Sequence, residues 1–459
     1  MNPMVKLLNS SELRIETLNA FRSIVLVVNP LVWYSVIIIF LQNILTQQLS
    51  NGILTSTEAT FIWCLHFSGI VFAALIGSSL TKKFEINRFL IVWMALGTIS
   101  SISLFAVGTT SILVLGFIVL LLGVSLGLGM PACMEYYTDS LPIENRGRIG
   151  GVIMLISGIG VFLGTAFLPS SALVLCAILA IWRLTSLLVF YPLRSMEMFH
   201  HSEKQTPSYR HVLSQQSFVL YFIPWAMFSL VNYLSGSAQL EILGANTVAD
   251  ISLIQSVMTA LFAVIGGFLL DFVGRKRIAI SGFIFLGVDS ATLGLFPDKA
   301  WANYFGGALN GVAWGFLLSI FIVTIWGDLS QNMRSAKYYA IGVSPFFISK
   351  LLGITVGATM SSLILKVAGQ NGFFSFLAFF LCVAVLPLVY APETLPEKTM
   401  KDRDLKSYAE KALKQSAKQA DKKKSKDADN SEVEGKENEE EGHQQSGYDE
   451  ALELAEKYY

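Results

Sequence analysis

Residues 267–277 read GFLLDFVGRKR, and this short polar stretch lies between two apolar runs of about twenty residues. A helix of that length crosses the roughly 30 Å hydrocarbon core of a bilayer. The stretch combines glycine with one acid and three bases, which suits a tight connection between two spans at the membrane surface. The sequence here therefore predicts two membrane-spanning helices joined by a short basic loop.

Apolar runs of this size recur along the whole chain. Of its 459 residues, 53% are hydrophobic and only 14% are charged, whereas soluble domains are about 25% charged. We therefore predict an all-α membrane protein with twelve transmembrane helices. They are expected at 21–46, 57–80, 89–108, 111–138, 149–168, 171–193, 216–238, 248–270, 278–296, 300–327, 340–366 and 372–391.

Basic residues gather in alternate loops of this arrangement, as the positive-inside rule requires. The opposite set of loops holds only Lys299 and Lys366. We therefore expect a multi-pass protein of the cell membrane with both termini in the cytoplasm. The basic set holds Lys82, Lys83, Arg88, Arg146, Arg148, Arg194, Lys204, Arg210, Arg275, Lys276, Arg277, Arg334 and Lys337.

Matching residues recur at an offset of about 190 positions, which indicates two related halves. Gly77 matches Gly267, Asp139 matches Asp328, Arg146 matches Arg334, and Trp33 matches Trp225. We predict two pseudo-symmetric six-helix bundles. The expected parts are a cytoplasmic N-terminus (1–20), a first bundle (21–193), a linker (194–215), a second bundle (216–391) and a charged, disordered cytoplasmic tail (392–459).

The loop Gly267 to Arg277 resembles the signature loop of the major facilitator superfamily, Gly-x-x-x-Asp-x-x-Gly-Arg-Lys/Arg-Arg/Lys. Two further elements resemble the sugar and metabolite porter branch: Asp139-Ser-Leu-Pro-Ile-Glu-Asn-Arg146-Gly147, and Pro392-Glu393-Thr394. The first-half counterpart of the signature loop departs from it, with Thr81 in place of the acid. The resemblance implies a cytoplasmic gate, which we place at Asp139, Arg146, Asp271, Arg275, Asp328 and Arg334.

The same resemblance implies that the first, fourth, seventh and tenth spans line a central path. Polar and aromatic residues recur at helical spacing there, and a lysine lies deep within the eleventh span. Amides and aromatic rings can bind a small polar solute, although in membranes they also join helices to one another. The candidate substrate-binding residues are Asn29, Trp33, Asn43, Tyr221, Trp225, Asn232, Asn310, Trp314 and Lys350.

Two titratable residues in the spans are candidates for coupling to a proton. Glu135 lies near the inner end of the fourth span, and His66 lies in the second span. Ionisable groups at membrane depth are costly and often functional, and imidazole titrates near neutral pH. Arg183 and Asp289 lie on helices expected to be peripheral, and we interpret them as structural.

Together these features predict a secondary transporter that moves a small polar organic solute, such as a sugar, by alternating access, with or without a co-transported proton. The alternatives are an organic anion or monocarboxylate transporter, suggested by Lys350, and a non-transporting sensor with the same fold. No Walker-type phosphate-binding loop is present, so we expect no nucleotide hydrolysis on this chain. An enzyme would need clustered His, Asp and Glu at the membrane face, and the chain has only five histidines, so we expect no enzyme activity, no cofactor and no metal. The expected partners are the small-molecule substrate and the lipid bilayer, without nucleic acid, for a monomeric protein.

Overall fold

The computed structural model describes residues 3–108, 111–167, 171–193, 204–296 and 299–395. Residues Met1–Leu395 form one compact unit, and we describe that unit alone. Nearly all of the predicted charged tail therefore lies outside the described residues. Within the described ranges the chain is helical apart from short connections and one isolated β-bridge between Gln205 and Met333.

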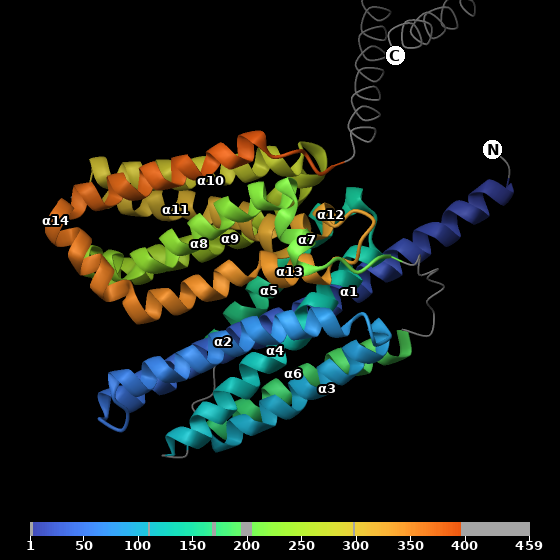
Figure 1. Ribbon diagram of the computed structural model, residues 1–459, viewed down its shortest axis with the longest axis horizontal. Coiled ribbons are helices and arrows are strands. Elements are labelled where there is room, and N and C mark those ends of the chain that lie inside the picture. The colour runs from blue at the N-terminus through green and yellow to red at the C-terminus, as the bar shows by residue number, and fades with distance from the viewer. Residues whose placement is uncertain (1–2, 109–110, 168–170, 194–203, 297–298, 396–459) are drawn as a thin grey trace, which may run out of the picture. The chain divides into compact units, whose positions relative to one another are not determined.

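Six long helices form the first bundle, which is the lower group in Figure 1. The first of them is much longer than the predicted span, because it begins at the third residue rather than near residue 21. The six helices are α1 (Pro3–Ser50), α2 (Ser56–Leu80), α3 (Ile86–Ser103), α4 (Ile112–Ser140), α5 (Arg146–Ala166) and α6 (Ala172–Leu193).

A short helix in the linker, α7 (Tyr209–Ser214), leads into the second bundle, the upper group in Figure 1. One of its helices is interrupted by a π-helical turn at Ser319–Thr324, between α11 and α12. The bundle consists of α8 (Gln216–Leu243), α9 (Ala245–Phe272), α10 (Arg275–Leu295), α11 (Ala300–Leu318), α12 (Ile325–Leu329), α13 (Ala336–Gly342) and α14 (Ser344–Tyr390).

The described helices account for twelve membrane spans. Eleven segments are long and apolar enough to cross a bilayer, and the last of them, Ala336–Tyr390, is 55 residues long. Gly369 breaks this segment, because its φ of 64° lies in the left-handed region. Each part of α14 on either side of the break is long enough to span the membrane.

Local sequence explains two of the sharp connections. Thr55 and Glu58 form a reciprocal capping box at the start of α2, in which the Glu58 backbone N–H donates to the Thr55 hydroxyl at 3.3 Å. Between α9 and α10, Gly274 has a φ of 109°. A side chain at this position would also collide with Glu393. Only glycine fits that turn without strain.

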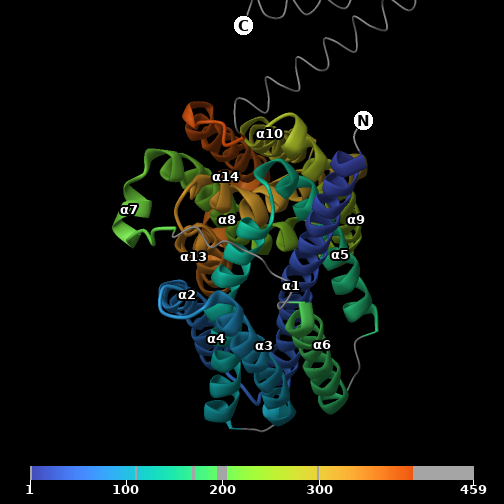
Figure 2. The ribbon, with the colours of Figure 1, turned by 90° about the vertical axis from the view of Figure 1, so that its right-hand side faces the viewer.

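The two bundles meet most tightly at one end of the spans, which we call the basic end (connections 80–86, 140–146, 272–275 and 329–336). Figure 2 shows α5 of the first bundle beside α9 of the second. A Cβ atom added to Gly267 would lie 2.5 Å from the Gly147 carbonyl oxygen and 2.8 Å from the Gly151 Cα. The two backbones are therefore in direct contact near the basic end, as small residues in membrane helices permit.

Candidate functional site

At the basic end, Asp328 joins the two bundles. One of its carboxylate oxygens accepts a hydrogen bond from Arg146 of the first bundle at 2.8 Å, and the other accepts from Arg275 of its own bundle at 3.0 Å. Arg275 is fully buried, and Asp328 is only 4% exposed. Buried charges of this kind are stable only when they are paired, so Asp328 is the shared acid of two arginines from different halves.

Asp271 makes a second link between the bundles at the first turn of α5. Its carboxylate accepts hydrogen bonds from the backbone N–H groups of Gly147 and Arg148 at 2.9 and 2.7 Å. It also pairs with Arg275 at 3.0 Å. The first N–H groups of a helix have no partner within the helix and carry partial positive charge. An acid from the second bundle thus accepts hydrogen bonds from the free backbone N–H groups at the N-terminus of α5 in the first bundle.

A third link involves Arg334, which pairs with the buried Glu135 of α4 at 3.1 Å. Arg334 also donates a hydrogen bond to the backbone carbonyl of Thr81, in the loop where the first half lacks the signature acid. Asp139 instead pairs with Lys204 of the linker at 2.6 Å. Four of the six predicted gate residues therefore share one network, while Asp139 and Arg334 make separate pairs beside it.

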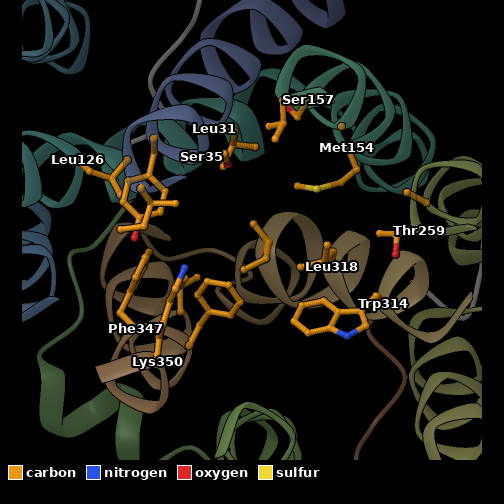
Figure 3. Close-up of a pocket in the computed structure, with 18 of the residues that line it drawn as sticks. Leu31, Ser35, Leu126, Met154, Ser157, Thr259, Trp314, Leu318, Phe347 and Lys350 are labelled. Carbon is orange, nitrogen blue, oxygen red and sulfur yellow. The ribbon is translucent and has the colours of Figure 1, made fainter. Parts of the chain in front are cut away.

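Between the bundles, further from the basic end, lies a cavity of about 1030 Å³. Its wall comes from both halves, with side chains of α1, α2, α4 and α5 facing those of α8, α9, α11 and α14. Figure 3 shows Leu31, Ser35 and Ser157 across the space from Trp314 and Lys350. Most of the wall is apolar, and several of its hydroxyls bond within their own helices; Ser252 and Ser256, for example, each donate to a backbone carbonyl at 2.7 Å.

Several polar groups of the cavity wall make no hydrogen bond to the described residues. Lys350 lies with its ammonium 5.9 Å from the ring centres of both Phe67 and Tyr233. No carboxylate among the described residues pairs with it or lines the cavity. The Tyr34 hydroxyl and the Trp314 indole N–H are buried and have no hydrogen-bond partner in the described part of the chain. The Ser157 hydroxyl on the same wall is also buried without a partner in these residues, so the cavity presents a cation and three unused N–H or O–H groups.

The π-helical turn at Ser319–Thr324 contributes to this wall, since its residue Ile322 and the preceding Leu318 both line the cavity. Such turns are rare and are found mostly at functional sites. In the described ranges, no group of three His, Cys, Asp or Glu side chains could hold a metal ion.

The fold was compared with solved structures. The human organic anion transporter MFSD10 superposes with a TM-score of 0.59 at 12% identity, over 81% of this chain and 99% of that one. The proton:xylose symporter XylE superposes with a TM-score of 0.57 at 14% identity, over 83% of this chain and 96% of that one. A double-tryptophan variant of XylE gives 0.60 at 16% identity, over 85% and 98%.

The protein has the major facilitator superfamily fold. The solved structures that share it are transporters and not enzymes. The match extends over most of the chain and confirms the predicted fold class, with twelve spans in two related bundles. No protein-family model matches the sequence, and no curated protein matches it either.

Within this superfamily fold, the predicted substrate residues of α1 lie away from the cavity wall. Asn29 donates to the Trp182 carbonyl at 2.6 Å and accepts from Arg183 at 2.9 Å. The Trp33 indole donates to the Ser101 hydroxyl at 2.7 Å. Both residues join α1 to its neighbours in the first bundle, and Asn43 is exposed near the far end of the helix.

On α8 and α11 the predicted residues divide between the core and the cavity. Tyr221 donates to the Pro392 carbonyl at 2.8 Å, and Trp225 is fully buried against Phe321. Asn310 donates to Asp289 at 2.8 Å. Asn232 is half-buried outside the cavity wall. Of the nine predicted substrate residues, Trp314 and Lys350 line the cavity.

The sequence did not single out three residues of the cavity wall, namely Tyr34, Tyr233 and Ser157. Nothing in a single sequence shows which face of a span turns to a cavity. His66 is fully buried beside this wall, stacked on Tyr34 with ring centres 6.0 Å apart. Its Nδ1 lies 2.9 Å from the Val119 carbonyl oxygen.

Proposed function

We propose that the protein is a secondary transporter of organic anions that works by alternating access. The observation that carries this proposal is Lys350, a cation on the wall of an otherwise apolar cavity that the described residues leave without an acidic partner. An ammonium in such surroundings is stabilised strongly by a bound carboxylate, sulfonate or phosphate. The Tyr34 hydroxyl and Trp314 N–H can donate to the same ligand.

The likeness to an organic anion transporter supports this proposal, although at 12% identity that likeness shows the fold alone. A sugar is the second candidate, favoured by the porter-like loops and by the likeness to the xylose symporter. Sugar recognition requires several free donors and acceptors around the ligand. The largely apolar wall of this cavity therefore favours the anion.

The mechanism follows from where the two halves are joined. The links through Asp328, Asp271 and Glu135 all lie at the basic end. By contrast, the contact between α5 and α9 is looser near the middle of the two helices, where a Cβ atom added to Gly158 would lie 3.7 Å from the Ala260 Cβ, an ordinary van der Waals distance. This conformation is closed at the basic end. Rocking the halves about the cavity would break these links and open the basic end instead.

We further propose that Glu135 couples transport to a proton, and that His66 does not. Glu135 pairs with Arg334 across the two halves, so its partner is lost whenever the basic end opens. A buried carboxylate without its cation is expensive unless it binds a proton. His66 instead contacts groups of its own half, namely Tyr34, Phe67 and the Val119 carbonyl.

The positive-inside rule places the basic end in the cytoplasm, and we propose this orientation in the cell membrane. An epitope tag before Pro3 tests it in intact cells. Antibody should bind the tag only after the membrane is permeabilised. Antibody binding to unpermeabilised cells would mean that the N-terminus lies outside the cell, contrary to the proposed orientation.

Counterflow in proteoliposomes tests the transport proposal. Vesicles loaded with an unlabelled aromatic carboxylate should accumulate the labelled compound transiently, whereas vesicles loaded with a hexose should not accumulate labelled hexose. Exchange of the hexose alone would favour the sugar candidate. If purified, folded protein exchanges neither compound nor any member of a wider metabolite set, the sensor alternative becomes the better description.

A further inference from the structure

One wall of the cavity differs from the others in its exposure. Where α5 and α9 form the wall, the side chains that line the cavity are also largely exposed: Phe162 is 60% exposed on α5, and Leu253 and Val257 are each 60% exposed on α9. Lining residues on the other helices are buried, as Tyr34 of α1 and Ile70 of α2 are, or half-buried. The cavity therefore reaches the surface between α5 and α9.

The opening between α5 and α9 does not extend to the basic end. There Gly151 and Gly267 bring the backbones of α5 and α9 into contact, so no side chain or ligand can pass between them. Seven residues further along each helix, at Gly158 and Ala260, the contact is an ordinary one between small groups. Beyond this point, the lining residues Phe162 of α5 and Leu253 and Val257 of α9 are exposed.

The depth of the opening places it within the lipid rather than in water. Val257 lies twelve residues into α9, which begins at Ala245, and that distance is about 18 Å along the helix. Both α5 and α9 belong to membrane-spanning segments. The exposed leucine, valine and phenylalanine side chains at this depth therefore meet hydrocarbon chains.

We infer that the transported anion is an amphiphile with one long hydrocarbon chain, which reaches the cavity from the bilayer through the opening between α5 and α9. Its anionic headgroup binds Lys350, and its chain lies along the apolar wall and leaves the cavity between the two helices. This inference rests on the proposed anion transport and adds the class of substrate and its path. It also accounts for a charged site within a wall that is mostly apolar, because the chain and the headgroup need different surroundings.

A competition experiment tests the path without depending on how fast an amphiphile crosses the bilayer by itself. Proteoliposomes take up a labelled short-chain organic anion, and single-chain amphiphiles are added to the membrane as inhibitors. Oleate and lysophosphatidate supply carboxylate and phosphate headgroups, and monoolein supplies a similar chain without charge. The wild-type protein should be inhibited by at least one of the two anions, which identifies the headgroup, and at least tenfold less by monoolein.

The opening itself is tested by two substitutions that fill it from opposite sides, Gly158→Trp on α5 and Val257→Trp on α9. In each variant, the amphiphile concentration that inhibits uptake by half should rise at least tenfold. The KM for the short anion should change much less. Ile156→Trp is the matched control, because Ile156 is 40% exposed on α5 but does not line the cavity. Val257 is already exposed, so a bulky ring there should not disturb folding.

The outcomes separate this inference from the proposed function. Inhibition that is unchanged in both variants, or lowered equally by Ile156→Trp, overturns the path between the helices. A short anion that is transported but never inhibited by either amphiphile overturns the substrate class and leaves anion transport standing. If the wild-type protein transports no anion and none of these compounds raises its melting temperature, both proposals fail together.

Discussion

The two bundles each contain a cation deep within the membrane, and the surroundings of the two differ. Arg183 of the first bundle is fully buried between the rings of Trp33 and Trp93, 5.0 and 4.7 Å from their centres, and donates to Asn29. Lys350 of the second bundle contacts aromatic rings on one side only and lines a cavity of about 1030 Å³. Neither has an acidic partner among the described residues.

The comparison shows that a charge at membrane depth does not by itself mark a binding site. Cation–π contacts and an amide can stabilise a guanidinium that no ligand ever reaches, and the Arg183 surroundings leave no room for one, since Gly97 packs directly against it. Lys350 differs from Arg183 because it lines a cavity that is large enough for a ligand. Four changes test this distinction, from the largest expected effect to the smallest.

Replacing Lys350 should have the largest effect on transport. Removing one partner of a desolvated charged pair typically costs about 2–5 kcal/mol, so Lys350→Ala should lower kcat/KM for the anion at least about thirtyfold. Lys350→Arg keeps the charge and should restore part of the activity. Lys366→Ala on the same helix is the control, because Lys366 is exposed at the far end of the span. Undiminished uptake by folded Lys350→Ala protein would contradict the anion site.

Removing the shared acid of the gate should be the next largest change. Asp328→Asn leaves Arg146 and Arg275 without their common partner, at a cost of about 3–5 kcal/mol to the closed basic end. Spin labels at Lys83→Cys and Arg277→Cys, in protein without its native cysteines, should move apart in this variant. Lys204→Ala, which removes only the partly exposed pair with Asp139, should leave that distance unchanged. An unaltered distance in Asp328→Asn would mean that this network does not hold the halves together.

Replacing Arg183 should affect stability and spare transport. Arg183→Ala removes two cation–π contacts and leaves the Asn29 side chain with an unmet acceptor, which together cost about 2–4 kcal/mol. The melting temperature of the purified protein should fall, while uptake per folded molecule stays within about twofold of wild type. A selective loss of uptake without loss of stability would remove the distinction between the two cations.

The smallest expected effect is a change in pH dependence. Glu135 faces Arg334 across the halves, beside the Asp139–Lys204 pair. Because Glu135 can bind a proton only when the basic end opens, wild-type uptake should rise as the pH on that side of the membrane falls, by less than about tenfold per pH unit. Glu135→Gln should flatten this profile, and His66→Gln should retain it although His66 lies next to Tyr34 and near Lys350. If Glu135→Gln retained the pH profile and His66→Gln flattened it, His66 would be the coupling site instead.

The sequence was sufficient to predict the fold because hydrophobic run length and loop charge are properties of whole segments. The gate motif was equally visible, since Asp271, Gly274 and Arg275 occupy fixed positions around one turn. The sequence did not show which side chains form the wall of the cavity. Trp33 and Tyr34 are adjacent and lie about 100° apart around α1; the first faces Ser101 in its own bundle, and the second faces the cavity.

The polar residues within the spans also did not indicate which side chains line the cavity of this protein. Amides such as Asn29 and Asn310 bond to Arg183 and Asp289 within a bundle, which is how such groups commonly join membrane helices. The cavity wall is mostly apolar, and in sequence an apolar side chain that faces a cavity looks the same as one that faces lipid. Lys350 was identifiable because a lone charge within a span is conspicuous.

The sharing of Asp328 and Asp271 has an electrostatic consequence when the halves separate. Both acids belong to the second bundle, where Arg275 remains with them. The first bundle would keep Arg146 and Arg148, together with the two backbone N–H groups at the start of α5 that Asp271 had satisfied. Uncapped helix starts attract anions. Opening would therefore create, beside the exit, a surface of positive potential, which would draw an organic anion of the proposed class out of the cavity and toward the basic end.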